Sequence, residues 1–164
     1  MDLLLEPPHG AGPVRLGMTL DEAVAAVAPW GEPRVRTRPN RVLVTVSAKC
    51  DKVGVEVLLE EEDTVTAIEL WWPGEGRETS TRVLLDGEDV FRAPADDILA
   101  RAAARGWTVD AENPENPVVP GVSLGFTRQT SQEVPRNADG IPLHFTSVLV
   151  AGEKYYDYRY ENAG

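Results

Sequence analysis

The stretch RVLVTVSAKCDKVGVEVLLEEEDTVTAIELWW, residues 41–72, contains three runs in which apolar side chains recur at every second position. These runs cover residues 41–47, 53–60 and 64–72. A period of two is typical of β-strands that bury one face and expose the other. The acidic segment EEED, residues 60–63, is typical of a solvated turn between strands. The stretch therefore predicts an antiparallel sheet.

The preceding segment VRLGMTLDEAVAAVAPWGEP, residues 14–33, carries the signals that begin and end a helix. Thr19 and Glu22 have the three-residue spacing of a capping box, in which each side chain satisfies a backbone N–H of the first turn. Pro29 and Gly31 end the helix, because neither continues it readily. The apolar residues between these signals fall on one stripe, which predicts a helix that covers a sheet and carries no chemistry.

The segment APADDILARAAARGW, residues 93–107, predicts a second helix, with Pro94 in its first turn and Gly106 at its end. The residues of the two helices align at a constant offset of 75 positions, as Gly31 and Gly106 do (106 − 31 = 75). Strand-like runs also follow this second helix, at residues 121–128, 143–150 and 154–160. A short strand, RVLL, is predicted between the halves at residues 82–85.

We therefore expect an α+β fold made of two helix-then-antiparallel-sheet halves, with the helices packed on one side of the sheet. Whether the two halves join in one continuous sheet stays open. The first half is residues 1–76 and the second is residues 77–164. A length of 164 residues fits one compact domain that contains both halves. The constant offset is consistent with an internal duplication, and separate origins of the two helices stay open.

The motif LGMTLDEAV followed by GEP, within residues 14–33, resembles the helix-opening motif of small bacterial helix-plus-sheet repeats. Examples are the tandem-repeat β-lactamase inhibitor proteins and the small outer-membrane assembly lipoproteins. In these families a Gly-Met-Thr cap precedes the helix and a Gly-x-Pro segment ends it. The resemblance implies a helix-plus-sheet fold and a role in binding or scaffolding, and it transfers no catalytic residue. The chain lacks the disulfides of those families, and its second helix has Ala-Pro-Ala in place of Met-Thr.

The chain is acidic: 27 Asp and Glu residues against 16 Lys and Arg give a formal net charge of −11. Phosphate groups would be repelled, so we expect no nucleic-acid partner, whereas a basic protein would be steered toward the surface. Cys50 is the one cysteine, which excludes an intrachain disulfide. The start of the chain lacks the basic stretch of a signal peptide, and no apolar run reaches the roughly 20 residues of a membrane helix. We expect a cytoplasmic bacterial protein with no membrane partner.

Motifs of the common catalytic and cofactor classes are absent, including the G-x-S-x-G elbow, the phosphate-binding loop and the H-E-x-x-H and C-x-x-C patterns. With two histidines and one cysteine, we expect no metal and no cofactor. His144 could act as a general base if a carboxylate orients it, and is otherwise an outward-facing strand residue. Cys50 is interpreted as a turn residue, because no acid–base partner for a nucleophile is visible.

Strand alternation indicates a candidate binding surface. Most valines of residues 41–72 fall on one face, which leaves Leu43, Leu58 and Trp71 on the opposite face beside Glu56 and Glu69. Apolar residues on a face expected to be exposed to solvent usually pack against another surface. We expect the second half, or a second copy in a homodimer, to supply it; the alternative is a docking site for another protein.

Three functions follow from these observations. The first is a non-catalytic protein-binding module, such as an acidic immunity or inhibitor protein with a basic partner. The second is a small-molecule-binding protein or a small hydrolase that uses His144 with nearby carboxylates. The third is an oligomeric structural subunit whose wet face contacts another copy. The missing catalytic motifs favour the first, and we expect no enzymatic activity.

Overall fold

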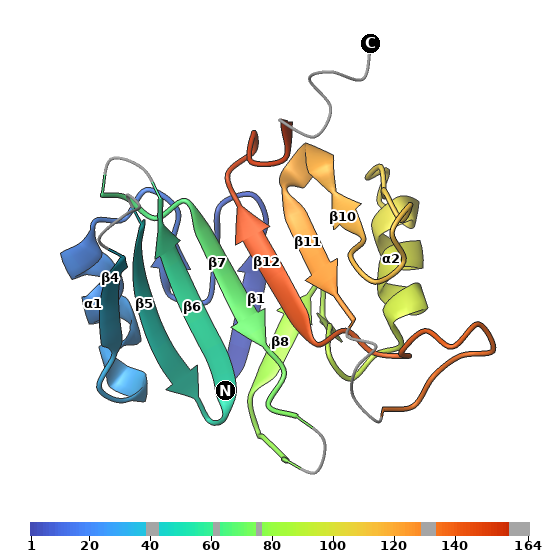
Figure 1. The fold of residues 1–164 in the computed structure, drawn as a ribbon, viewed down its shortest axis with the longest axis horizontal. Coiled ribbons are helices and arrows are strands. Elements are labelled where there is room, and N and C mark those ends of the chain that lie inside the picture. Colours follow the sequence, from blue (N-terminus) through green and yellow to red (C-terminus); the bar gives the residue numbers. More distant parts are fainter. Residues whose placement is uncertain (39–42, 61–62, 75–76, 129–133, 158–164) are drawn as a thin grey trace.

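The computed structural model describes residues 1–38, 43–60, 63–74, 77–128 and 134–157, and within these residues two β-sheets face each other (Figure 1). The large sheet has the strand order β10 (Val118–Val119), β11 (Leu124–Thr127), β12 (Ser147–Ala151), β7 (Ala67–Trp71), β6 (Val53–Leu59), β5 (Leu43–Cys50) and β4 (Arg34–Arg38). The small sheet has the order β3 (Val14–Arg15), β2 (Gly10–Ala11), β1 (Asp2–Glu6), β8 (Arg82–Leu85) and β9 (Glu88–Asp89).

The helices of the described residues are α1 (Leu20–Val27) and α2 (Ala95–Ala104), with 3₁₀ turns η1 (Ala28–Trp30) and η2 (Pro120–Val122). In Figure 1, α1 lies near the β4 end of the large sheet and α2 near the β10 end, while β1 and β8 lie behind its centre. The face of the large sheet that β1 and β8 cover is called the inner face below, and the opposite face the outer face.

The expected arrangement of two helix-then-sheet halves, with helices packed on one side of the sheet, is wrong. β7 of the first half pairs antiparallel with β12 of the second, so both halves do build one continuous sheet, which the sequence left open; the error lies in the layer expected to cover it. The layer behind it is largely a second sheet, in which β1 pairs in parallel with β8. The physical reason lies in the N-terminal run DLLLE, where buried Leu3 and Leu5 alternate with exposed neighbours and supply a strand in the middle of that layer.

The capping box of α1 is confirmed. The Thr19 hydroxyl accepts a hydrogen bond from the Glu22 backbone N–H at 3.3 Å, and the Glu22 carboxylate accepts one from the Thr19 backbone N–H at 3.3 Å. α2 begins 75 residues after α1 (95 − 20 = 75), but its N-cap Pro94 makes no side-chain cap. The predicted offset therefore holds for the helices, although their caps differ.

The turn between β5 and β6 fixes which side chains face outward. Asp51 and Lys52 both have positive φ, 42° and 75°, as a two-residue hairpin turn requires. Cys50 is thereby paired with Val53, and the register continues to Val44 opposite Leu59. Because side chains alternate along a strand, a shift of one residue would send every buried valine to the outer face.

The core lies between the two sheets. One row of mutually paired residues, Val46, Val57, Ile68 and Val150, crosses four strands of the large sheet, and each of these side chains is fully buried. The row belongs to the same apolar cluster as the small sheet and α1, through residues that include Leu3, Leu5, Val14, Val27 and Val83. Because the core lies against the inner face, the polar side chains of the large sheet lie mainly on its outer face, where a functional site is expected.

Most predicted strands are present, with shifted ends. The run at residues 82–85 matches β8, whereas β1 and β4 were not predicted. The run predicted at residues 154–160 is not a strand in its described part, because residues 154–157 form turns; the remainder lies outside the described residues. None of the described helices is long and apolar enough to cross a membrane.

Alanine substitutions on the two faces of the large sheet should lower the free energy of unfolding by different amounts. Ile68→Ala removes a fully buried side chain and should lower the free energy of unfolding by about 3 kcal/mol. Leu58→Ala, on the partly exposed outer face, should cost less than about 1 kcal/mol. Urea denaturation of the two variants measures both values, and equal losses would contradict the assignment of the faces.

Candidate functional site

The outer face of β5, β6 and β7 carries all five residues of the predicted interface. Leu43, Leu58, Trp71, Glu56 and Glu69 are each partly exposed, and the strand registers place them on the same side of the sheet. The second half does not cover this side as a layer, because its strands continue the same sheet beyond β7 (Figure 1). Within the described residues the second half reaches this side at its end, where the Tyr155 hydroxyl donates to the Glu60 carboxylate at 3.0 Å, and it does not cover the five residues as a layer.

Two carboxylates lie directly opposite each other at the centre of this face. The register of β6 and β7 pairs Glu56 with Glu69, and the same cross-strand row continues to Leu149 on β12. Like charges at directly opposed positions destabilise a sheet. No ion pair to either glutamate forms within the described residues, so this pair is a local cost that the fold carries.

Burial and charge together make Glu69 unusual. Loss of hydration raises the pKa of Glu69 above its ordinary 4.5, and the neighbouring Glu56 carboxylate raises it further. A hydrogen bond from the hydroxyl of Ser147, which is 2% exposed, acts in the opposite direction and lowers this pKa in part. Ser147 thus lowers the pKa of Glu69 only in part, and no cation among the described residues pairs with this carboxylate.

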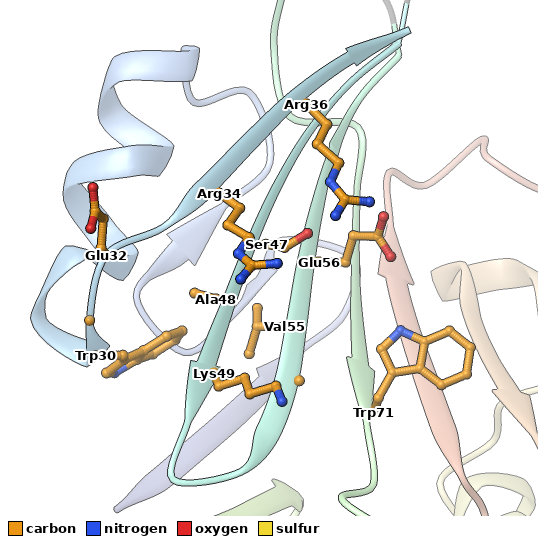
Figure 2. Close-up of a pocket in the computed structure, with 12 residues that line it drawn as sticks. Trp30, Glu32, Arg34, Arg36, Ser47, Ala48, Lys49, Val55, Glu56 and Trp71 are labelled. Carbon is orange, nitrogen blue, oxygen red and sulfur yellow. The ribbon is translucent and has the colours of Figure 1, made fainter.

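A groove of about 620 Å³ runs along this face from Glu56 to the edge of the sheet (Figure 2), and Glu69 is not among the residues that line it. Trp71 borders it at one end, on β7, and Trp30 borders it at the other, in η1. Trp71 faces Gly54 across the β6–β7 pair, and a Cβ at Gly54 would lie 3.4 Å from the Trp71 Cβ. Glycine at this position therefore avoids a close contact with Trp71, whose indole extends from β7 toward β12 in Figure 2.

Three cations line the groove between the tryptophans: Arg34, Arg36 and Lys49. All three are exposed, and in the described part of the chain their side chains form no ion pair or hydrogen bond. Figure 2 shows Arg36 directed across the sheet toward Glu56. The groove thus has three cations on β4 and β5, one carboxylate, Glu56, on β6, and a second carboxylate, Glu32, just before β4.

Sequence reasoning missed the basic side, because β4 was not predicted. All five of its residues are exposed, so the apolar period that reveals other strands is absent. The available signal was the alternation of Arg34, Arg36 and Arg38 with Val35 and Thr37, which resembles an edge strand protected by charge.

His144 lies outside this groove. Its Nδ1 is 3.1 Å from the backbone carbonyl of Ala93, so Nδ1 donates to a carbonyl and no carboxylate orients the ring among the described residues. His144 lines a separate pocket of about 290 Å³ with Trp72 and Phe91.

Cys50 ends β5 on the inner face and is 3% exposed, with its sulfur 3.4 Å from the sulfur of Met1. It therefore lies at a strand end and not in the turn itself. The described residues contain no cluster of three or more His, Cys, Asp or Glu side chains that could hold a metal ion.

Comparison of the chain with protein-family models, with curated proteins and with solved structures finds no match.

Replacement of Glu69 by glutamine should stabilise the fold at neutral pH. The pKa of Glu69 is raised on folding, so its charged form costs stability above that pKa, and the cost disappears below the ordinary value of 4.5. Glu69→Gln should therefore raise the free energy of unfolding by about 0.5 kcal/mol at pH 7 and leave it unchanged near pH 4.

Chemical denaturation across this pH range checks the effect, with Glu112→Gln as a control at an exposed glutamate. Destabilisation by Glu69→Gln at pH 7 would show that the carboxylate makes a favourable contact in the free protein.

Proposed function

We propose that this chain is a non-catalytic binding protein that receives a lysine or arginine of another protein between Glu56 and Glu69, beside Trp71. The partner docks on the outer face of β5, β6 and β7. This is the role of an acidic binding module with a basic partner, the class to which immunity and inhibitor proteins belong.

The observation that supports this proposal most strongly is the opposed carboxylate pair. Glu56 and Glu69 face each other, and no ion pair to either forms within the described residues; burial, and then the Glu56 carboxylate, raises the pKa of Glu69. A cationic side chain placed between two carboxylates turns their repulsion into two charge-assisted hydrogen bonds. The repulsion between the two carboxylates costs energy in the free protein, and a bound cation would remove that cost. This difference favours binding of a cation.

The neighbouring side chains have the composition of an interface centre. Tryptophan and arginine are the residue types most enriched among interface residues that dominate binding energy. Trp71 offers an indole next to the carboxylates, so an incoming cation can lie over the ring as well as between the glutamates. Leu58 and Leu43 extend the apolar surface along the same face.

The shape of the site favours a protein over a small ligand. Small-molecule pockets enclose most of the ligand surface and are lined mainly by apolar side chains. The groove here lies on the open face of a sheet and is lined by five charged side chains: Glu32, Arg34, Arg36, Lys49 and Glu56. The net charge of −11 adds long-range attraction for a basic partner.

Selection of binders from a random-peptide display library, with the purified chain as the target, tests this function. We expect the selected peptides to carry lysine or arginine, and their affinity to fall about tenfold or more on the double substitution Glu56→Gln and Glu69→Gln. Trp71→Ala should weaken them as well. Glu112→Gln, at an exposed glutamate, is the matched control and should leave the affinity unchanged.

The affinity should also fall as the pH drops through the raised pKa of Glu69, since a protonated carboxyl no longer attracts a cation. Selected peptides without basic residues, or equal affinity for the wild type and the double variant, would contradict the proposal. Self-association that the double variant abolishes would assign this face to a homodimer instead.

A further inference from the structure

β4 forms one edge of the large sheet and has a free backbone side. It pairs with β5 from Arg34 opposite Ser47 to Arg38 opposite Leu43, and no other strand of the described residues pairs with it. Successive residues of a strand direct their N–H and C=O groups to alternate sides. One set of these groups therefore points away from β5, and between the described residues no backbone hydrogen bond from residues 34–38 other than those of the ladder is present.

The side chains of this edge carry positive charge that no ion pair within the described residues neutralises, although Arg36 is directed toward Glu56 in Figure 2. Arg34, Arg36 and Arg38 lie on the outer face, are exposed, and make no ion pair or side-chain hydrogen bond within the described residues. Elsewhere in the described part of the chain, six arginines each pair with a carboxylate: Arg15, Arg82, Arg92, Arg101, Arg105 and Arg128. In a chain with 27 acidic residues, three free cations on one five-residue strand are a local reversal of charge.

Arginines at a sheet edge also discourage pairing between identical copies, because like charges would face each other across the new ladder. This protection accounts for positive charge at β4 but leaves the edge open to a strand of opposite charge. Specificity that rejects one partner and attracts another commonly arises from the same charged residues. The edge therefore selects against a second copy of β4 and in favour of an acidic strand.

We propose that β4 accepts an extended acidic segment of the partner protein by strand addition. The segment forms backbone hydrogen bonds with the free side of β4, and its Asp or Glu side chains, at every second position, face Arg34, Arg36 and Arg38 on the outer face. Peptide recognition by strand addition takes its affinity from the backbone and its specificity from alternate side chains. The inference rests on the proposed function in that the partner is a protein, but it concerns the edge of the sheet and not the glutamate pair.

The test uses a short synthetic peptide of alternating glutamate and valine. Two comparison peptides are the same sequence with N-methyl groups on alternate residues, which removes the backbone donors, and a lysine–valine peptide. Fluorescence anisotropy with labelled peptide measures the affinity for the wild type and for Arg36→Glu. Arg77→Glu is the matched control, because Arg77 is also exposed and lies outside β4. Circular dichroism confirms that each variant is folded.

We expect the glutamate–valine peptide to bind the wild type and Arg77→Glu equally, and Arg36→Glu at least about tenfold more weakly. The N-methylated and lysine–valine peptides should bind at least about tenfold more weakly than the parent peptide. Backbone amide signals of Val35 and Thr37 should shift on titration with the parent peptide.

Equal binding of the N-methylated peptide would overturn strand addition, because charge alone would then explain the affinity. Tight binding of a single-stranded oligonucleotide that Arg36→Glu abolishes would overturn the choice of a protein segment. The single substitution Glu69→Gln, on β7, should leave peptide binding at β4 unchanged. If the glutamate–valine peptide does not bind β4 while basic peptides still bind at Glu56 and Glu69, this inference is wrong. The proposed function is then unaffected.

Discussion

The antiparallel pairing of β7 with β12 is the interaction on which the rest of the structure depends. Its register runs from Ala67 opposite Ala151 to Trp71 opposite Ser147. It joins strands of the two chain halves into one sheet and carries the buried row from Ile68 to Val150. Because the second half extends the sheet sideways, it does not form a layer over the outer face. The same pairing places Ser147 beside Glu69, and so creates the half-buried carboxylate.

The charge distribution of the outer face follows from this geometry. Glu56 and Glu69 lie on the central strands β6 and β7, whereas Arg34 lies in the same cross-strand row on the edge strand β4. Neighbouring strands are about 4.8 Å apart, so Arg34 is two strand spacings from Glu56. The outer face is therefore positively charged at β4 and negatively charged at β6 and β7. Within the described residues these charges form no ion pairs with each other. A partner segment that matches this polarity would meet attraction at both places.

The sequence predicted local features and the side-chain alternation well. Thr19 and Glu22 form the capping box, residues 82–85 form β8, and the five interface candidates lie on one face, because each of these depends on neighbouring residues in the chain. The pairing of β7 with β12 depends on which strand edges remain free after folding, and no local pattern records it. β4 and its arginines were missed for a related reason: a fully exposed edge strand has no apolar period.

The N-terminal segment shows how one unassigned strand changes the architecture. Leu3 and Leu5 were visible as part of a leucine run, but their alternation is too short to distinguish a strand from a helix turn. Their parallel pairing with β8 at Val83 places a second sheet where the helix-plus-sheet resemblance implied helices.

The central claim is that the outer face holds an uncompensated carboxylate pair prepared for a cation. A carbon-detected NMR titration of the Glu69 side-chain carboxyl in the free protein measures this most directly. The account predicts a midpoint above 4.5 that moves down when Glu56 is replaced by glutamine, because one source of repulsion is then removed. A midpoint at or below 4.5, or one that does not respond to Glu56→Gln, would contradict it.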